Sequence, residues 1–204
     1  MRTYSRYLRG GRINLPYTNI ICIVGAGGTG KDTLAQGLVA RLREKGHLVL
    51  SETTRPMRDG EHDGLDYHFV TDDEFTSTSH IEEREYRGWH YGIPYGEIMM
   101  DKMNVAVVDV CGAISLKDYA DKMGIPIVCI YLETGGWTRL ARMIKREGMV
   151  KFEHFRRHYS DTKDFSYAWN VLSKIFFGKT EYIDTTYLSQ QTVLNKAMGF
   201  LMTV

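Results

Sequence analysis

The amino-acid sequence predicts an α/β fold of three layers, in which helices cover both faces of a parallel sheet. Short runs of β-branched and apolar residues alternate along the chain with segments of helical periodicity. The first apolar run is followed directly by a glycine-rich turn and then by the first helical segment. Because connections between parallel strands are right-handed and return over a face of the sheet, this alternation places the helices outside a buried sheet.

The first elements are a strand, a helix and a second strand. Residues 19–24 (NIICIV) are mainly β-branched, which is typical of a strand buried on both faces. Residues 31–45 carry apolar side chains at helical spacing and end at Gly46, a residue type that often terminates helices. We expect the second strand to span residues 47–54 (HLVLSETT).

The alternation continues in the second half of the chain. We predict two more buried strands at 104–110 and 126–132, a helix between them at 113–123, further helices at 136–146, 152–174 and 188–201, and a last strand at 181–184. Residues 55–100 interrupt this rhythm, because Gly, Pro, charged and aromatic residues occur there in short pieces. Long insertions in compact α/β domains are commonly functional, so we interpret this stretch as an inserted lobe.

Composition and charge narrow the class of protein. The 204 residues are 43% hydrophobic, which suits one domain with a full core and no need of disulfides. The net charge of +1 gives no electrostatic reason to expect nucleic acid or a membrane as a partner. Cysteines 22, 111 and 129 are expected as buried free thiols. With no signal-peptide pattern and no apolar stretch of about 20 residues, we expect a cytoplasmic protein.

The glycine-rich turn has the spacing of a phosphate-binding loop. Residues 25–31 (GAGGTGK) match G-x-x-x-x-G-K and lie between the predicted strand and helix. Glycines let backbone N–H groups converge on a phosphate, the helix N-terminus adds a partial positive charge, and a lysine reaches the β and γ oxygens. The pattern predicts ATP-binding residues Gly25, Gly27, Gly28, Thr29, Gly30, Lys31, Asp32 and Thr33.

The residue after Lys31 departs from that motif. A Ser or Thr hydroxyl normally binds Mg²⁺ there, whereas this chain has Asp32 followed by Thr33. Thr33 is rotated about 100° further round the helix and does not simply replace the hydroxyl. A carboxylate is a suitable hard-oxygen ligand, directly or through water, so Asp32 is the candidate magnesium ligand.

Residues 51–70 (SETTRPMRDGEHDGLDYHFV) carry a second and longer pattern. It resembles the guanylate kinase signature, in which a strand ending S-x-T-T-R runs into R-P-x-R-x-G-E-x-x-G-x-D-Y-x-F. Residues 91–92 (YG) match a turn of the same family, and residues 109–113 (DVCGA) resemble its D-V-Q-G-A segment. The resemblance covers about residues 19–190 and implies a P-loop kinase fold with an inserted nucleoside-monophosphate-binding lobe and a helical lid.

The resemblance also implies how one such domain is divided. We expect an N-terminal arm at 1–17, a core formed by 18–54, 103–141 and 158–204, a monophosphate-binding lobe at 55–102 and a lid at 142–157.

An acceptor site follows from the resemblance. Arg55 and Arg58 would hold a monophosphate dianion through charge-assisted hydrogen bonds, and Tyr67 and Tyr91 would donate their hydroxyls to the same oxygens. Glu82 lies nine residues before Tyr91, as the guanine-contacting glutamate of the family does. A carboxylate there accepts hydrogen bonds from guanine N1–H and N2–H, which adenine does not offer.

Other residues of the base pocket match the family less well. Ser51 and Asp109 would complete the pocket, but Ile93 stands where the family has a Thr or Ser that donates to guanine O6. The Trp89 indole N–H is an alternative donor to O6. Thr185 replaces an asparagine expected near the adenine pocket, and Cys111 replaces a glutamine. These departures leave the preference for guanine open.

Basic residues of the predicted lid are the candidate catalytic groups besides Lys31. Phosphoryl transfer between two polyanions requires positive charge around the transferring oxygens, which mobile arginines supply. The lid arginines implied by the resemblance are Arg142, Arg146 and Arg157.

The sequence therefore predicts ATP- and Mg²⁺-dependent transfer to a nucleoside monophosphate, with GMP or dGMP favoured. A kinase of another nucleotide or of a sugar phosphate, a non-catalytic guanylate-kinase-like binding module and a regulatory NTPase are the alternatives. The expected partners are small nucleotides, and the pattern does not determine an oligomeric state.

Overall fold

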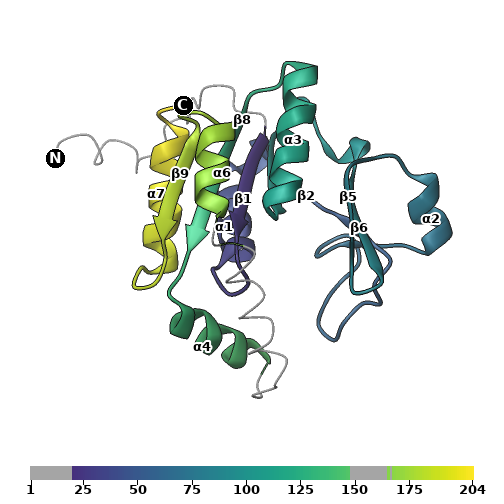
Figure 1. Cartoon of the computed structure of the whole chain (residues 1–204), viewed down its shortest axis with the longest axis horizontal. Coiled ribbons are helices and arrows are strands. Elements are labelled where there is room, and N and C mark those ends of the chain that lie inside the picture. Colours follow the sequence, from purple (N-terminus) through teal and green to yellow (C-terminus); the bar gives the residue numbers. More distant parts are fainter. Residues whose placement is uncertain (1–19, 148–164, 166) are drawn as a thin grey trace.

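The computed structural model describes residues 20–147, 165 and 167–204 and contains two β-sheets (Figure 1). The larger sheet is parallel, with the strand order β2-β7-β1-β8-β9. Its strands are β1 (Ile20–Gly25), β2 (Gly46–Val49), β7 (Met103–Val108), β8 (Ile127–Glu133) and β9 (Thr180–Asp184). Strand β1 lies at the centre, and all its residues are buried, as its β-branched sequence predicted.

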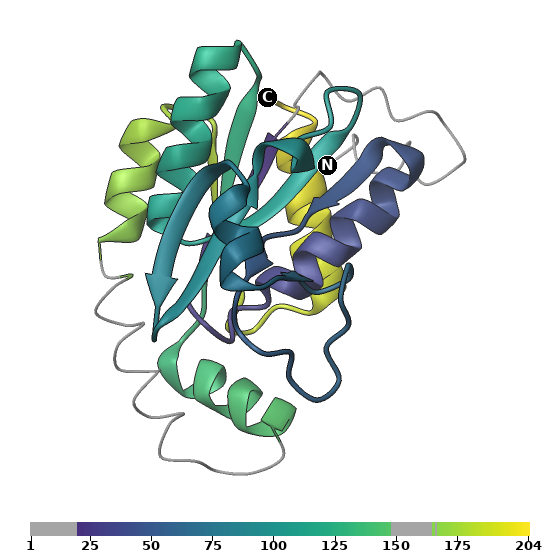
Figure 2. The same ribbon diagram turned by 90° about the vertical axis from the view of Figure 1, so that its right-hand side faces the viewer.

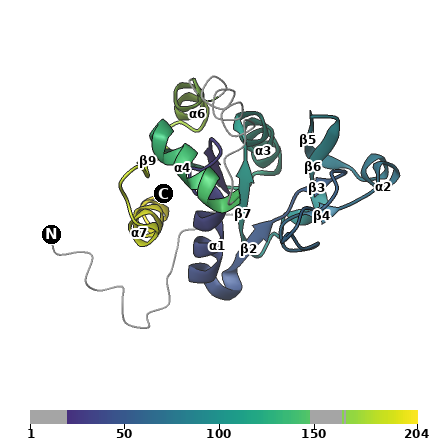
Figure 3. The same ribbon diagram turned by 90° about the horizontal axis from the view of Figure 1, so that it is seen from below.

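Helices cover both faces of this sheet, so the predicted three layers are confirmed (Figure 3). One face carries α1 (Lys31–Leu42) and α7 (Gln190–Leu201), and the other carries α3 (Val110–Met123) and α6 (Ala168–Ile175). Side chains of β1 alternate between the two cores, since successive residues of a strand point to opposite faces. Ile21 and Ile23 pack toward α1 and α7, whereas Cys22 packs toward α3 and α6.

The insertion forms a lobe with its own sheet, which faces the viewer in Figure 2. The strand order is β4-β3-β6-β5, and the strands are β3 (Glu52–Thr53), β4 (His68–Phe69), β5 (His80–Tyr86) and β6 (Trp89–Pro94). A short helix α2 (Asp72–Ser77) and the 3₁₀ turn η3 (Tyr95–Glu97) complete it, and another 3₁₀ turn η2 (Arg43–Lys45) extends α1. Helix α4 (Gly136–Glu147) follows β8 at the edge of the core sheet where its strands end (Figure 1).

The expectation of one strand at 47–54 was wrong. The chain leaves the core sheet after Val49 and enters the lobe sheet at Glu52. Between them, the Leu50 N–H donates to the carboxylate of Glu97 at 2.9 Å. A side chain therefore accepts the backbone hydrogen bond that neither sheet provides where the chain crosses from one sheet to the other.

Other element boundaries differ in smaller ways. Helix α3 begins three residues before the predicted start, because the Asp109 carboxylate caps it by accepting from the Gly112 N–H at 2.8 Å. Cys111 lies exposed in its first turn, so the expectation that all three thiols are buried was wrong for this one. The predicted helix at 152–174 is represented by α6, and residues 152–164 lie outside the described part of the chain.

Two further expectations concern segments that the structure does not describe. The arm at 1–17 and most of the lid at 142–157 lie outside the described residues. Among the helices that are described, none has the length and apolar character needed to span a membrane.

Candidate active site

The loop between β1 and α1 is held by hydrogen bonds to its carbonyl oxygens. Lys31 Nζ and Thr29 Oγ1 both donate to Ala26 O, at 3.1 and 2.8 Å. From helix α4, Arg139 Nε donates to Gly27 O at 2.9 Å. Because the protein engages the loop from its carbonyl side, backbone N–H groups can converge on an anion from the opposite side. The assignment of this loop to the ATP phosphates stays a prediction.

Gly28 shows why this loop needs glycine. Its φ is 80°, a left-handed conformation that residues with a side chain rarely adopt. A Cβ atom at this position would lie 2.9 Å from the Arg139 carbonyl oxygen. Glycine therefore lets α4 pack directly on the loop.

Thr185, directly after β9, joins the loop to helix α4. The side chain is buried, and its Oγ1 donates to Thr29 O at 3.1 Å. Arg142 Nη1 donates to the same Oγ1 at 3.1 Å, and Arg142 Nη2 donates to Thr185 O at 2.8 Å. Thr134 Oγ1 lies 2.5 Å from Thr185 Oγ1, and since the Thr185 proton is already used, Thr134 is the donor. One hydroxyl thus connects the loop, the end of β8 and Arg142 of α4.

Replacing Thr185 with valine should lower the free energy of unfolding by about 1–3 kcal/mol, because Thr29 O and the Thr134 hydroxyl lose a buried partner. Urea denaturation measures the change. The exposed Thr76→Val, which removes only a surface hydroxyl of α2, serves as the matched control and should change stability by about 0.5 kcal/mol or less. Equal effects of the two substitutions would contradict a structural role for the buried hydroxyl.

A cavity of about 1100 Å³ opens beside the loop, between α1, α4 and α7. It is lined by residues 28–33, and so by all the predicted ATP-binding residues except Gly25 and Gly27. Arg142 and Thr185 form another part of its wall, together with Gln190 from α7. The cavity is large enough for a nucleotide, and basic side chains form part of its wall.

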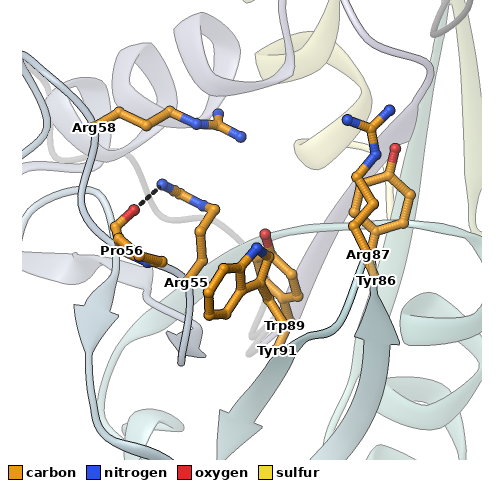
Figure 4. A pocket seen from close by; sticks show the side chains of 7 residues that line it. All are labelled: Arg55, Pro56, Arg58, Tyr86, Arg87, Trp89 and Tyr91. Atoms are coloured by element: carbon orange, nitrogen blue, oxygen red, sulfur yellow. Dashed lines mark hydrogen bonds between the residues drawn. The ribbon is translucent and has the colours of Figure 1, made fainter.

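The lobe contains a second cavity, of about 420 Å³ (Figure 4). Arg55 and Arg58 lie on one side of it, Trp89 and Tyr91 lie in the middle, and Arg87 lies on the other side with Tyr86. The structure thus brings three predicted acceptor residues together and adds a third arginine that the sequence did not single out. Three guanidinium groups around one cavity favour binding of an anion such as a phosphate.

Arg55 is held in place by Glu61, which sequence reasoning missed. Both terminal nitrogens of Arg55 donate to the Glu61 carboxylate, at 2.9 and 3.0 Å, and Arg55 Nη1 also donates to Pro56 O. Burial opposes the charge of Arg55, but these hydrogen bonds outweigh it and raise its pKa. The same glutamate accepts from the Arg58 N–H at 2.8 Å. The R-P-x-R-x-G-E spacing contained this residue, so the signal was present in the sequence.

Tyr67 packs beside two residues of the arginine-lined cavity. Its ring lies 5.5 Å from the guanidinium carbon of Arg55 and packs edge-on against Tyr91 at 6.1 Å. Burial raises the pKa of Tyr67, and the negative charge of Asp32 raises it further. Tyr67 itself lines neither cavity, and it lies beside the arginine-lined cavity through these contacts with Arg55 and Tyr91.

The β5–β6 hairpin places two of the predicted base-contacting residues, Glu82 and Ile93, opposite each other. Its register pairs Glu82 with Ile93 and Arg84 with Tyr91. Ile93 is only 1% exposed, packs into the core beneath α3, and lines neither cavity. Glu82 beside it is 8% exposed, and its carboxyl carbon lies against the first turn of α3.

Acidic and basic groups meet at this end of the hairpin. Asp109 caps α3 and forms an ion pair with Arg84, which the sequence did not single out. Burial is the main reason that the pKa of Glu82 rises to about 7, with Arg84 opposing the rise and Asp109 adding to it. Ser51 lies between the two sheets, where its carbonyl accepts from the His68 N–H, and it lines neither cavity.

The lid arginines are only partly described. Arg142 contacts Thr185 and, at 3.4 Å, the Gly28 carbonyl oxygen. Arg146 belongs to α4, but its side chain lies outside the described part of the structure, as does the whole of Arg157. Their catalytic assignment stays a prediction.

Known proteins resemble this chain along most of its length. The family model for guanylate kinase matches residues 17–169. A guanylate kinase of Caulobacter vibrioides is 31% identical over 190 residues, covering 87% of each chain. One of Mycoplasmopsis pulmonis is 33% identical over 146 residues, covering 66% of this chain and 74% of the relative. The crystal structure of guanylate kinase from Anaplasma phagocytophilum superimposes with a TM-score of 0.59 at 19% identity, covering 93% of this chain and 87% of that one.

Proposed function

Because the chain belongs to the guanylate kinase family, we propose that it transfers the γ-phosphoryl group of ATP to GMP or dGMP, producing ADP and the nucleoside diphosphate. Guanylate kinases are phosphotransferases, and this chain is therefore a phosphotransferase. One observation carries the finer proposal. The chain forms two separate cavities, one beside the glycine-rich loop and one lined by three arginines, and a kinase needs one phosphate-binding site for its donor and one for its acceptor.

In this proposal the loop and its surroundings bind ATP. Residues 25–33 receive the phosphates, and Lys31 neutralises the β and γ oxygens. The described residues contain no group of three acidic, histidine or cysteine side chains that could hold a metal ion alone. Asp32 is exposed at the start of α1, and Mg²⁺ is commonly bound by one or two carboxylates together with substrate phosphates. The residues present therefore fit a magnesium ion that enters with ATP and neutralises phosphate charge.

The acceptor binds in the lobe. Arg55 and Arg58 contact its phosphate with help from the hydroxyls of Tyr67 and Tyr91, and Glu82 accepts from guanine N1–H and N2–H. Glu61 keeps Arg55 oriented before the acceptor arrives. A phosphate monoester is already largely ionised at neutral pH, so no general base is required. Positioning and electrostatic stabilisation by Lys31 and the lid arginines Arg142, Arg146 and Arg157 account for the rate.

Product identification tests this function. Incubation with Mg²⁺, GMP and ATP labelled in the γ-phosphate should move the label into the β-phosphate of GDP, which chromatography separates. Label released only as inorganic phosphate would indicate an NTPase. Binding of GMP without transfer would indicate a non-catalytic binding module. Either result would overturn the proposal.

The KM for GMP should depend on pH through Glu82. A pKa of about 7 means that Glu82 changes from the neutral acid to the carboxylate between pH 6 and pH 8. Only the carboxylate accepts from both guanine N–H groups, so the KM should fall by about tenfold over that interval. Steady-state kinetics across this range measures it. Glu82→Gln is the control, because the pH dependence that it retains reports the titration of the GMP phosphate alone. Matching profiles for the two proteins would refute the role of Glu82.

A further inference from the structure

Arg84 lies beside Glu82 and Asp109, two residues predicted for the base pocket, and like them it lines neither of the two cavities. It shares one face of β5 with Glu82, two residues earlier, and pairs across the hairpin with Tyr91. Its guanidinium carbon lies 5.3 Å from the centre of the Tyr91 ring, and its Nη1 donates to Asp109. The side chain is 41% exposed, so part of it is open to solvent.

The neighbourhood of Glu82 provides acceptors for guanine but lacks the hydroxyl donor expected at Ile93. Guanine also presents two acceptors, O6 and N7, on the edge adjoining N1–H. The side chain of Ile93 has no hydrogen-bond donor and is buried in the core. Trp89 lies four residues before it on β6, about 13 Å away at a strand rise of about 3.3 Å per residue. The indole N–H is therefore too far along the strand to serve the same edge.

Arg84 has both the position and the chemistry for that edge. Residues two apart on one face of a strand are separated by about 6.6 Å, which suits two side chains contacting adjacent edges of one base. A guanidinium group has five N–H donors in a planar fork, so the bond to Asp109 leaves further donors for a ligand. Arginine donating to O6 and N7 is the commonest specific contact to guanine in protein–DNA complexes.

We propose that Arg84 is a specificity-determining residue that donates hydrogen bonds to O6 and N7 of the guanine base, while Glu82 accepts from N1–H and N2–H. The inference rests on the proposed function. Asp109 orients the fork, and the Tyr91 ring supports it from one side. Adenine places an amino donor where guanine has O6, so the same arginine disfavours AMP. This assignment explains how guanine can be recognised although Ile93 replaces a hydroxyl.

Two nucleotide analogues separate the roles of Arg84 and Glu82. In 7-deaza-GMP the N7 acceptor is replaced by C–H, and in IMP the N2 amino group is absent. The experiment measures kcat/KM for GMP and both analogues with wild type, Arg84→Met, Arg84→Lys and Glu82→Gln. Glu85→Gln is the matched control, because Glu85 is exposed on the opposite face of the same strand.

The wild type should use 7-deaza-GMP about tenfold less well than GMP, as expected for loss of half of a bidentate contact. Arg84→Met should lose about tenfold or more with GMP and should no longer distinguish it from 7-deaza-GMP, while its preference for GMP over IMP persists. Glu82→Gln should show the reverse pattern, and Glu85→Gln should match the wild type. Each ratio compares two substrates of one protein, so partial unfolding does not alter it.

A wild type that uses GMP and 7-deaza-GMP equally well would overturn the inference, as would a 7-deaza ratio that Arg84→Met leaves unchanged. If Arg84→Met fails to fold, Arg84→Lys provides the test. A single ammonium group cannot donate to O6 and N7 as a planar fork does, so the ratio of kcat/KM for GMP to that for 7-deaza-GMP should fall toward one. Wild type that forms no GDP from GMP would overturn the proposed function itself, and with it this inference. Failure of the proposed function is therefore seen with the wild type alone, whereas failure of the Arg84 inference is seen in the ratio of GMP to 7-deaza-GMP.

Discussion

Replacing Lys31 with methionine should lower kcat by roughly a thousandfold, the scale of losing one preorganised charge at a reacting centre. Methionine keeps the length of the side chain but removes the charge. Nζ of Lys31 lies 3.1 Å from Ala26 O, inside the loop that we assign to the ATP phosphates, so its loss affects the donor and the transition state. Binding of GMP, which depends on the lobe, should change little.

Turnover is measured by a coupled ADP assay, and GMP affinity by calorimetry. Lys45→Met serves as the control, because Lys45 is exposed in η2 at the far end of the first helix. Near-normal turnover of a correctly folded Lys31→Met protein would contradict the assignment of the loop.

Replacing Arg58 with alanine should raise the KM for GMP by roughly 10- to 100-fold and leave the KM for ATP nearly unchanged, because hydrogen bonds to charged groups contribute about 1.5–3 kcal/mol. Arg58 is the better test of the acceptor cavity than Arg55. Its side chain is 57% exposed, with its Nη1 4.0 Å from the Glu61 carboxylate, so truncation leaves no buried charge unpaired. Arg55→Ala would leave the Glu61 carboxylate without its ion-pair partner, and a loss of folding would then be mistaken for a loss of binding.

Steady-state kinetics with each substrate varied in turn distinguishes the two sites. Arg41→Ala, in the last turn of α1 and outside both cavities, controls for the loss of one positive charge. Equal increases in the KM values for GMP and ATP would show that Arg58 does not belong to the acceptor site alone.

Local patterns predicted the parts of the site that are formed by consecutive residues. The glycine spacing of residues 25–31 identified the loop, because a left-handed residue and a close helix contact both require glycine there. The spacing of Arg55 and Arg58 likewise placed both in one cavity, since a single turn carries them. Buried β-branched runs likewise predicted the core strands, because the signal for each strand lies within a few consecutive residues.

Contacts between distant segments could not be predicted in this way. Thr185 joins residues 29, 134 and 142, which meet only after the sheet has formed. Arg84 was missed because its neighbours depend on the register of the β5–β6 hairpin. That register is set by a turn in which Arg87 and Gly88 both have positive φ, and arginine is not a residue type that signals such a turn. The break at Leu50 depends on Glu97, which is 47 residues away.

The most direct test of the central claim is kcat/KM for the purified protein with Mg²⁺ and ATP and each of GMP, dGMP, AMP, CMP and UMP in turn. GMP and dGMP should be used best, and kcat/KM for the other three should be lower by roughly a hundredfold or more, as expected when buried polar groups are left unpaired. A preference for a monophosphate other than GMP or dGMP, or no ADP formed with any of the five, would contradict the claim.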